Sequence, residues 1–379
     1  MMTDADILII GAGSVGMAAG YYAARRGARV LLIDEGSPPH ALGSHHGSTR
    51  LTRTAYGEGA VYIPLLLRAR TLWAELEQLS GEPLFEPCGV LNLGEADSPF
   101  LAQVERSAAD YKLALETENA AGIEARWPGW RVPAGFVGGF EPDAGVLYCE
   151  RALSAWHRLG AGHGACLLGG RIVTGLRAFS GGVEAELADG ARLTAARVLV
   201  CAGQRVAPLM ASLGLALPLQ RVRKTFAWYR AESGRYGPAA FPGFSADLAD
   251  AIYYGFPALN GEGLKLGRHD AGQPLAPGEP LLPFGGCAED RAELDAFVRR
   301  FLPGVGECLE GKVCHYIRTP DEHFLLDRHP EFEQVFYASA CSGHGFKFAG
   351  VLGEVFAHWM LDGEPGFDLS HFALSRFGA

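Results

Sequence analysis

Residues 5–35, ADILIIGAGSVGMAAGYYAARRGARVLLIDE, constrain the fold more than any other stretch, because they read as strand, glycine turn, helix and second strand. The apolar runs at 7–10 and 30–33 are uninterrupted, as is typical of strands that are buried on both faces. Residues 14–26 have a helical composition, and Gly27 is placed to end the helix. The stretch therefore predicts a β-α-β unit.

The turn inside this unit has a glycine spacing that suits a dinucleotide. Gly11, Gly13 and Gly16 allow a tight turn and a close approach of the backbone to a pyrophosphate. The helix that begins at Ser14 offers free N–H groups to that anion, and Asp34 can accept hydrogen bonds from a ribose diol. The glycine spacing alone is a weak signal, but the elements around it favour a nucleotide site over a glycine turn without a ligand.

The same fingerprint serves nicotinamide and flavin cofactors, and two later junctions favour FAD. ARVLVCAG (196–203) and SGHGFKFAGVLGEV (342–355) each run from a strand into glycines. An extended FAD needs such remote contacts, whereas a nicotinamide dehydrogenase usually has a second contiguous domain. The last junction also places a helix N-terminus near residues 345–347, where its dipole and Lys347 could stabilise negative charge on a flavin ring. We expect FAD, with a nicotinamide dehydrogenase as the alternative.

Segments that resemble a nucleotide-binding fold alternate along the chain with strand-rich segments. This alternation predicts an α/β (α+β) protein with two domains interleaved in sequence. Its 379 residues are many for a single core. We assign 1–83, 150–217 and 324–379 to a discontinuous FAD-binding domain, and the strand-rich segments 84–149 and 218–323 to a substrate domain.

Within these segments, three local structures are expected. Residues 36–59 are interpreted as a polar loop, and 61–81 as an amphipathic helix. Residues 171–203 are interpreted as a strand meander with a hairpin turn at Asp189 and Gly190.

Composition excludes several classes of protein. The net charge is −10 and there is no run of basic residues, so nucleic acid is not an expected partner. The eight cysteines form no CxxC pair, which favours free thiols in a reducing compartment. No apolar run approaches about 18 residues, the first strand begins by Asp6, and no residues have metal-ligand spacing. We expect a soluble cytoplasmic protein without a membrane span, a signal peptide or a metal.

Motifs along almost the whole chain resemble one known family, the monomeric sarcosine oxidase and N-methyltryptophan oxidase group of FAD-dependent amine oxidases. They are DILIIGAGSVGMAAGYYAARRG, PPHALGSHHGSTR, AYGEG, RWPGWRVP, FEPDAGVL, YYGFP, LKLGRH and SGHGFKF. VRKTFAWYRAE, LNLG and LSRF resemble the N-methyltryptophan oxidase branch more closely. The resemblance implies a Rossmann-like FAD-binding domain interleaved with a mixed-sheet substrate domain.

The resemblance also implies an activity. An FAD-dependent oxidase of this kind demethylates N-methyl amino acids with O2, giving the amino acid, formaldehyde and hydrogen peroxide, and we expect it to act as a monomer. The alternatives are an oxidase of sarcosine or of a cyclic imino acid such as pipecolate, and a non-catalytic flavin-binding protein.

Cys314 occupies the position at which this family attaches the flavin through a thioether, so the resemblance implies covalent FAD. On a strand, Cys314 and Tyr316 share one face while Val313 and His315 share the other. Cys314 and Tyr316 could therefore both face a flavin ring and a substrate. Position alone favours a small buried hydrophobe at Cys314.

Other site residues are carried over from the family at matching positions. The resemblance places Arg50 beside the flavin ring, and Arg53 and Lys347 on the substrate carboxylate. It places Lys265 where a buried cation promotes oxygen reduction, and His269 and Tyr254 in the substrate pocket. The remaining cofactor residues that it implies are Ser44, His45, Thr49, Val173, Gly203, Gly343, Gly345 and Phe346.

Two positions depart from the family pattern. Thr54 replaces a common histidine, and Arg205 stands where a tryptophan is usual. Both departures bear on the identity of the substrate more than on the chemistry.

Overall fold

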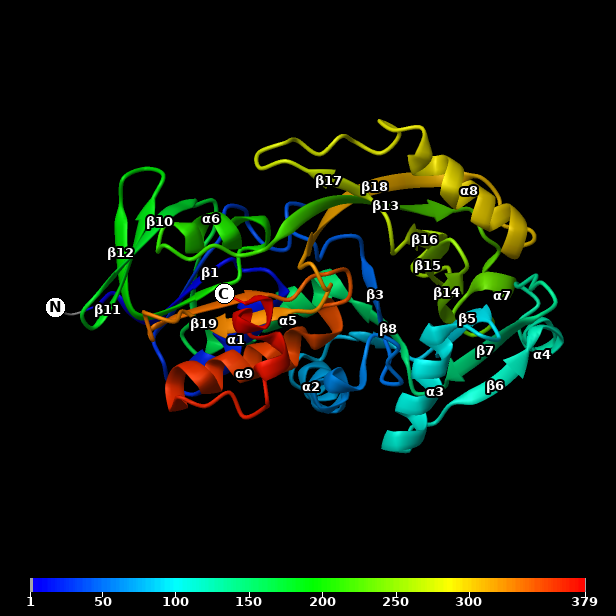
Figure 1. Ribbon diagram of the computed structural model, residues 1–379, viewed down its shortest axis with the longest axis horizontal. Helices are drawn as coiled ribbons and strands as arrows, with labels where there is room; N and C mark the ends of the chain where they lie inside the picture. Colours follow the sequence, from blue (N-terminus) through cyan, green and yellow to red (C-terminus); the bar gives the residue numbers. More distant parts are fainter. Residues whose placement is uncertain (1–2, 379) are drawn as a thin grey trace.

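The computed structural model describes residues 3–378, so residues 1–2 and 379 of the predicted domains lie outside it. Two large β-sheets make up most of the chain, the first on the left of Figure 1 and the second on the right. The molecule therefore has the mixed α/β architecture that the sequence predicts.

The predicted β-α-β unit lies at the centre of the first, eight-stranded sheet. Its strands are β1 (Ala5–Ile10), β2 (Val30–Ile33), β9 (Cys166–Leu168), β10 (Val173–Phe179), β11 (Gly182–Leu187), β12 (Arg192–Val200), β19 (Leu325–Arg328) and β20 (Val335–Ser339). β1 pairs in parallel with β2 on one side and β12 on the other. Ile7 and Ile9 of β1 join one hydrophobic core, and Leu8 and Ile10 join another. The predicted burial of this strand on both faces is confirmed.

The predicted meander is also present. β10, β11 and β12 pair antiparallel in sequence order, and the backbone N–H of Gly190 donates to the carbonyl of Leu187 in the connecting turn. Gly190 has a φ of 82°, a left-handed conformation that favours glycine. The hairpin at Asp189 and Gly190 is therefore confirmed.

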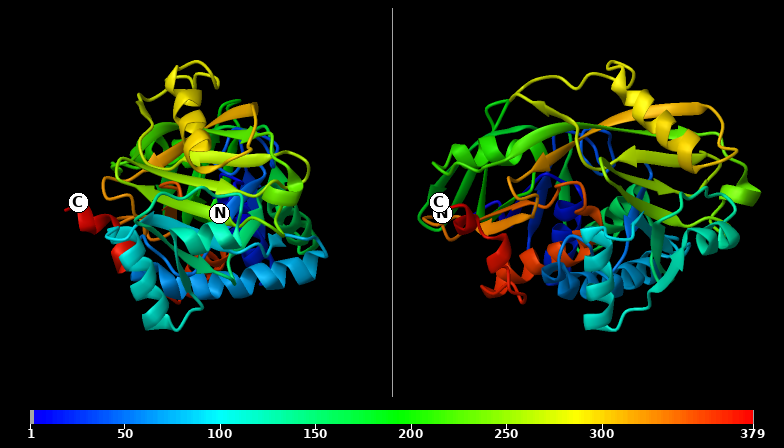
Figure 2. Two further views of the ribbon diagram at one scale, coloured as in Figure 1. Left: turned by 90° about the vertical axis from the view of Figure 1, so that its right-hand side faces the viewer. Right: turned by 45° about the vertical axis from the view of Figure 1, so that its right-hand side comes forward.

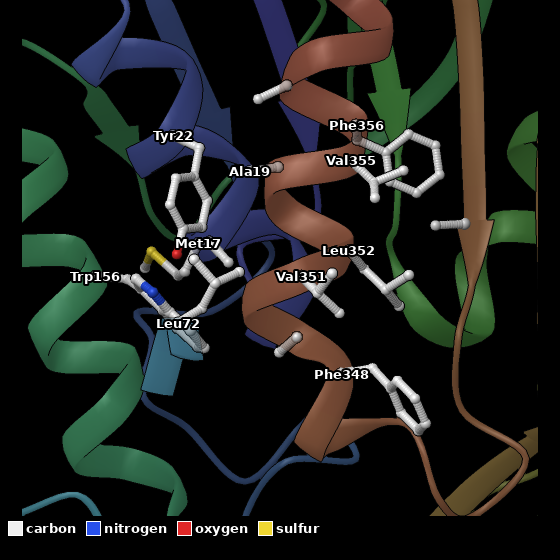
Figure 3. Close-up of a cluster of buried hydrophobic side chains, with 14 of the residues drawn as sticks. Met17, Ala19, Tyr22, Leu72, Trp156, Phe348, Val351, Leu352, Val355 and Phe356 are labelled. Atoms are coloured by element: carbon white, nitrogen blue, oxygen red, sulfur yellow. The ribbon is translucent and has the colours of Figure 1, made fainter. Parts of the chain in front are cut away.

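Helices from distant parts of the chain cover one face of the first sheet. They are α1 (Ser14–Arg25), α2 (Ile63–Ser80), α5 (Cys149–Gly162) and α9 (Ala349–Asp362), while the short α6 (Val206–Ala211) packs on the other face. Figure 3 shows α9, with Val351 and Val355, beside α1, with Met17 and Tyr22, and these side chains belong to one hydrophobic core with Trp156 of α5. This core joins the two ends of the described chain.

Gly353 lets α9 approach α1 closely. A Cβ added at Gly353 would lie 2.5 Å from the Cβ of Ala18 and 2.6 Å from the backbone N of Ala19. Gly350, one turn earlier, has only ordinary contacts, since its Cβ would lie 3.6 Å from Leu72 and from Trp156.

We expect Gly353→Ala to lower the free energy of unfolding by about 1–3 kcal/mol, because two helix backbones must separate to admit one methyl group. Gly350→Ala is the matched control and should raise stability by up to about 1 kcal/mol, because alanine favours helix. Urea unfolding followed by circular dichroism measures both. Equal stability of the two variants would contradict the tight helix contact.

The second sheet has nine strands and is mixed. They are β5 (Val90–Glu95), β6 (Glu116–Asn119), β7 (Phe136–Glu141), β13 (Gln220–Tyr229), β14 (Gly243–Leu248), β15 (Ala251–Phe256), β16 (Leu264–Arg268), β17 (Gln273–Leu275) and β18 (Cys308–Arg318). β5 and β14 are parallel, and the other pairs are antiparallel. A further sheet of three short strands consists of β3 (Thr49–Thr52), β4 (Phe85–Glu86) and β8 (Gly145–Tyr148).

Four helices accompany the second sheet: α3 (Pro99–Tyr111), α4 (Ala120–Arg126), α7 (Ser233–Tyr236) and α8 (Glu289–Phe301). In Figure 2, as in Figure 1, α8 lies above the sheet while α2 and α9 lie at the bottom of the molecule. Short 3-10 turns complete the described elements, at Ala60–Tyr62, Gly203–Arg205, Phe346–Phe348, Ser370–Phe372 and Leu374–Phe377.

One expectation about local structure is wrong, and another is incomplete. Residues 36–59 contain the strand β3 as well as loop, because β8 supplies hydrogen-bonding partners that a polar sequence does not reveal. The segment 84–149 holds the helices α3 and α4 besides strands. Ser98 caps α3 by accepting from the backbone N–H of Leu101, and Asn119 caps α4 by accepting from Gly122.

The chain passes between the sheets several times, as an interleaved arrangement requires, and the domain boundaries themselves stay a prediction. All eight cysteines have free thiols. Within residues 3–378, no helix combines the length and the apolar character needed to cross a membrane.

Candidate active site

An elongated cavity of about 440 Å³ lies where the two large sheets meet. It extends from the glycine turn after β1 to the turn before α9. The predicted site residues that line it are Gly11, Gly13, Ser14, Asp34, Ser44, His45, Arg50, Arg53, Val173, Gly203, Tyr254, His269, Cys314, Tyr316, Gly343, Gly345, Phe346 and Lys347. Gly16, Thr49 and Lys265 are not part of the lining.

The glycine turn is closed by contacts that exclude side chains. Gly11 has a φ of 99°, and a Cβ there would lie 2.6 Å from Cα of Ala202, in the turn after β12. A Cβ at Gly16 would overlap the carbonyl oxygen of Gly11, so Gly16 holds the helix against the turn instead of facing the cavity. The turn thus presents its backbone to the cavity.

Asp34 is held by three donors on the cavity wall. Its Oδ2 accepts from the backbone N–H of Ala12 at 2.7 Å, and its Oδ1 accepts from Gly36 N at 2.9 Å. Nε2 of His40, which the sequence analysis did not single out, lies 2.7 Å from the same Oδ1. These bonds orient the carboxylate, whose remaining lone pairs can accept from hydroxyl groups.

His45 lies against the glycine turn. A Cβ at Gly13 would lie 3.7 Å from Nδ1 of His45. Nε2 of His45 is buried and has no hydrogen-bond partner among the described residues. Burial lowers the pKa of His45 to about 3, so the ring is neutral and can offer its N–H to an anion in the cavity.

Two cations bind carbonyls of the loop that precedes β3 and of Thr49, the first residue of β3. The guanidinium of Arg50 donates to the carbonyl oxygens of Ser44, His46 and Thr49 at 2.6–2.9 Å. Ser44 in turn donates its hydroxyl to the carbonyl of His315 in β18, at 2.7 Å. The loop is therefore attached to the second sheet.

Lys265 lies behind this loop, outside the cavity lining. Its Nζ donates to the Gly47 carbonyl, to the Thr49 carbonyl at 3.0 Å and to Oγ1 of Thr49 at 3.3 Å. The aromatic ring of Phe226, which lines the cavity, lies 4.9 Å from Nζ. Burial and the nearby Arg50 lower the pKa of Lys265 to about 7. Lys265 thus places its charge behind the cavity wall.

Arg53 faces the other end of the cavity, where it pairs with an acidic residue that the sequence analysis left unassigned. Its NH1 and NH2 atoms donate to the two carboxylate oxygens of Glu58 at 3.1 and 2.6 Å. Burial raises the pKa of a carboxyl, but Arg53 and the smaller contributions of other nearby groups, Lys347 among them, together outweigh burial and hold the pKa of Glu58 at about 2. Glu141 fixes the backbone beside Arg53 by accepting from the N–H groups of Thr54 and Ala55 at 2.6 and 2.9 Å.

Lys347 lies near Arg53, in the 3-10 turn Phe346–Phe348 that leads into α9. Its Nζ donates to the carbonyl of His344 at 2.8 Å and to the hydroxyl of Tyr56 at 3.2 Å. Burial and Arg53 lower the pKa of Lys347 to about 7. Two cations, one of them already paired with Glu58, therefore face the same end of the cavity.

Aromatic and thiol groups of the second sheet form the wall between these ends. Cys314 and Tyr316 alternate along β18 and both line the cavity, as expected from their shared face. The ring centroids of Tyr316 and His269 are 5.9 Å apart. Burial raises the pKa of Cys314 to about 11 and lowers the pKa of His269 to about 4. His315 also lines the cavity, which its position on the opposite face of the strand did not predict.

The two departures from the family pattern lie apart. Arg205 lines the cavity near the first glycine turn and donates to the carbonyl of Val173 at 2.8 Å. Thr54 is buried outside the lining.

Comparisons with known proteins agree with this geometry. Residues 6–359 match the family described as FAD dependent oxidoreductase. The N-methyl-L-tryptophan oxidase of Citrobacter koseri is 48% identical over 374 residues, which are 98% of this chain and 99% of that protein. The N-methyl-L-tryptophan oxidase of Yersinia pestis is 46% identical over 376 residues, 99% of this chain and 100% of that protein. The chain belongs to the N-methyl-L-tryptophan oxidase family of FAD-dependent oxidoreductases.

Solved structures share the fold of this chain. NikD, an amino acid oxidase essential for nikkomycin biosynthesis, matches with a TM-score of 0.87 at 24% identity, over 98% of this chain and 97% of its own. Glycine oxidase from Geobacillus kaustophilus matches with a TM-score of 0.83 at 21% identity, over 99% of both chains. These structures bear on the fold alone, and they confirm the predicted fold class.

FAD is the cofactor of this oxidoreductase family, and the predicted choice of flavin over nicotinamide is confirmed. The residues fit that cofactor. The glycine turn and the orphaned Nε2 of His45 suit a pyrophosphate, and Asp34 suits a ribose. Cys314 and Arg50 line the same cavity, where the two sheets meet.

Proposed function

We propose that this oxidoreductase demethylates N-methyl amino acids with a large apolar side chain, N-methyl-L-tryptophan foremost. The full-length similarity to N-methyl-L-tryptophan oxidases carries this proposal. One N-methyl amino acid, one O2 and one water give one primary amino acid, one formaldehyde and one hydrogen peroxide. When bound, FAD supplies the acceptor for the hydride equivalent of the N-methyl carbon and passes two electrons to O2.

Arg53 and Lys347 are proposed to bind the substrate carboxylate. Each charge-assisted hydrogen bond to a carboxylate is worth about 1.5–3 kcal/mol, so together they favour amino acids over simple amines. Because Glu58 already occupies Arg53, the substrate carboxylate must replace it or share the guanidinium. The paired state keeps the Arg53 charge compensated when no substrate is bound.

Apolar and neutral polar groups are proposed to receive the rest of the substrate. Phe100, Tyr254 and Tyr316 line the cavity and offer aromatic faces to an indole. Burial raises the pKa of Tyr254, so its phenol remains a donor. His269 is neutral at pH 7 because burial lowers its pKa to about 4, so it can accept a hydrogen bond from the substrate amine.

Cys314 is proposed to join the flavin through a thioether. One S–H bond of Cys314 and one C–H bond of the flavin are replaced by an S–C bond, and the two electrons and two protons released reduce O2 to hydrogen peroxide. Its burial in the cavity wall supports this assignment. The neighbouring cation Arg50 favours the thiolate that such a bond requires, against the effect of burial.

Lys265 is proposed to assist oxygen reduction, with Arg50 beside it. Both cations are fixed by backbone carbonyls, so their charge needs no reorganisation when negative charge develops nearby. Lys265 would act through the wall formed by Phe226 and the loop before β3.

A panel of substrates that each lack one group tests the proposal. Peroxide should form fastest from N-methyl-L-tryptophan, and at least about tenfold more slowly from N-methyltryptamine, which lacks the carboxylate and with it a charge-assisted bond. L-Tryptophan lacks the methyl group and should give no formaldehyde. Sarcosine lacks the indole, and pipecolate tests the cyclic alternative.

Other rankings would change the assignment. A preference for sarcosine or pipecolate would replace the proposed substrate class. A yellow protein that forms no peroxide with any secondary amine would favour a flavin-binding protein.

A further inference from the structure

Lys347 begins a chain of hydrogen bonds that leads away from the cavity. Its Nζ donates to the hydroxyl of Tyr56 at 3.2 Å, and that hydroxyl lies 2.7 Å from Nδ1 of His344. Nε2 of His344 lies 3.3 Å from the carbonyl oxygen of Glu322. Lys347, Tyr56 and His344 are all buried, so bulk water does not compete for these bonds.

The two ends of the chain fix the direction of each hydrogen bond. An ammonium has donors and no acceptor, whereas a carbonyl oxygen only accepts. Lys347 therefore donates to Tyr56, and His344 donates from Nε2 to Glu322. The single proton of the Tyr56 hydroxyl then goes to Nδ1 of His344, which must be the unprotonated nitrogen of a neutral ring.

We propose that Tyr56 and His344 are positioning residues that keep Lys347 protonated and aimed at the substrate carboxylate. This inference rests on the proposed function, because it deepens the carboxylate role of Lys347. A neutral lysine could still donate to both acceptors, but more weakly than an ammonium, and its lone pair could not accept the Tyr56 proton, because His344 already takes that proton. The chain of hydrogen bonds from Lys347 through Tyr56 and His344 to Glu322, called the relay below, consequently stabilises the ammonium of Lys347 over the amine.

Lys347 needs such support because its surroundings act against the ammonium. Burial and the guanidinium of Arg53 lower the pKa of Lys347 to about 7, and Glu58 opposes them. A lysine with this pKa would lose its charge just above neutrality, so each acceptor of the ammonium counts.

His344 stays neutral over the same range. Burial lowers the pKa of His344 to about 3, and the charges of Lys347 and His269 act in the same direction while Glu58 opposes them. The ring of Tyr62 packs edge-on against His344 with centroids 5.4 Å apart, and its hydroxyl bonds to His323 instead.

Tyr56→Phe isolates the hydroxyl, because a phenylalanine ring keeps the contacts of the aromatic face with Lys347 and Arg53, now 4.9 and 5.0 Å away. The probe is indole-3-propionate, which carries a carboxylate and an indole but no amine. Its Kd for the flavin-containing enzyme is measured from pH 6 to 9 by the change in flavin absorbance. The only ionisable group of the probe is fully charged above about pH 6.

The sign of the expected effect follows from the cationic form. Wild-type Kd should be constant below the pKa of Lys347 and rise above it. In Tyr56→Phe the ammonium of Lys347 has lost one acceptor, so its pKa falls. The break, which is the pH at which Kd begins to rise, then moves about one unit lower. At pH 8 the variant should bind about tenfold more weakly, and near pH 6 the two Kd values should differ by only about twofold.

A pair of substitutions at His344 tests the second step. His344→Leu removes the acceptor for the Tyr56 proton and should move the break in the same direction. His344→Asn puts an amide oxygen near the place of Nδ1 and should restore most of the wild-type profile. Tyr62→Phe, which removes the neighbouring hydroxyl that bonds to His323, should leave the profile unchanged.

Two other lysines titrate in the same window, since burial lowers the pKa of Lys224 to about 8 and that of Lys265 to about 7. Neither Lys224 nor Lys265 bonds to Tyr56 or His344, so both affect the pH dependence of Kd equally in the wild type and in every variant.

The outcomes separate the relay from the proposed function. A Tyr56→Phe enzyme with a Kd that is weakened equally at every pH, or unchanged, would overturn the relay while the carboxylate site stands. A wild-type enzyme that binds neither indole-3-propionate nor any N-methyl amino acid would overturn the proposed function and the relay together.

Discussion

Replacing Lys265 with methionine is expected to slow the reaction with O2 by about a hundredfold to a thousandfold, the usual effect of losing one fixed electrostatic donor. The substitution keeps the aliphatic stem among the rings of Phe226 and Phe256 and removes only the charge. Anaerobic reduction of the flavin by substrate should change by no more than a few fold. Stopped-flow absorbance measures the two half-reactions separately.

The pH dependence gives an independent readout of the same charge. Because burial lowers the pKa of Lys265 to about 7, the cationic form is present below neutrality and is lost as the pH rises. The wild-type oxygen rate should therefore fall above about pH 7, and the Lys265→Met rate should lose this step. Lys312→Met is the matched control, since Lys312 is partly exposed and pairs with Glu310. Equal slowing of both half-reactions in Lys265→Met would count against the oxygen role.

Replacing Cys314 with serine is expected to release all of the flavin on acid precipitation, whereas the wild-type precipitate should remain yellow. A serine hydroxyl ionises far too weakly to replace the thiolate in forming the bond to the flavin. Cys314 has a free thiol and lines the cavity, so the thiol can react with a group bound there. The absorbance of supernatant and pellet after precipitation measures the attachment.

Cys341 provides the control for this experiment, because its thiol lines the same cavity. Cys341→Ser should keep the colour in the precipitate. If the colour stays with Cys314→Ser and leaves with Cys341→Ser, the attachment is at Cys341 and the proposed assignment is wrong.

The sequence predicted best what depends on neighbouring residues. Residues 7–10 predict a strand buried on both faces, because every position is apolar. In the structure Ile7 and Leu8 pack into different hydrophobic cores. The glycine spacing predicts a turn that excludes side chains, and Gly11 meets Ala202 there. Such signals are local, so a single sequence contains them.

Structures that depend on distant partners were beyond the sequence. The strand Thr49–Thr52 exists because β8 pairs with it, and its own residues are those of a polar loop. The capping residues Ser98 and Asn119 were, in contrast, readable signals for α3 and α4.

The same distinction holds at the site. Glu58 lies inside the motif AYGEG, but only the fold shows that it neutralises Arg53. The position of Lys265 against the flavin stays a prediction, and the structure adds its three acceptors, which are the Gly47 carbonyl and two oxygens of Thr49, the first residue of β3. A histidine inside the last glycine turn could have been weighed as a functional residue, since His344 stands among residues already assigned to the site.

The packing of α9 on α1 has a consequence for how the protein is made. The ribosome releases α1 long before α9. The apolar surface of α1 that packs on α9 is therefore uncovered while the intervening chain is synthesised. β1 waits in the same way for β12, and β12 for β20. Long-range contacts of this kind delay folding and leave apolar surface exposed to chaperones or to aggregation. The cavity, which the last glycine turn helps to line, is therefore complete only after that turn has emerged.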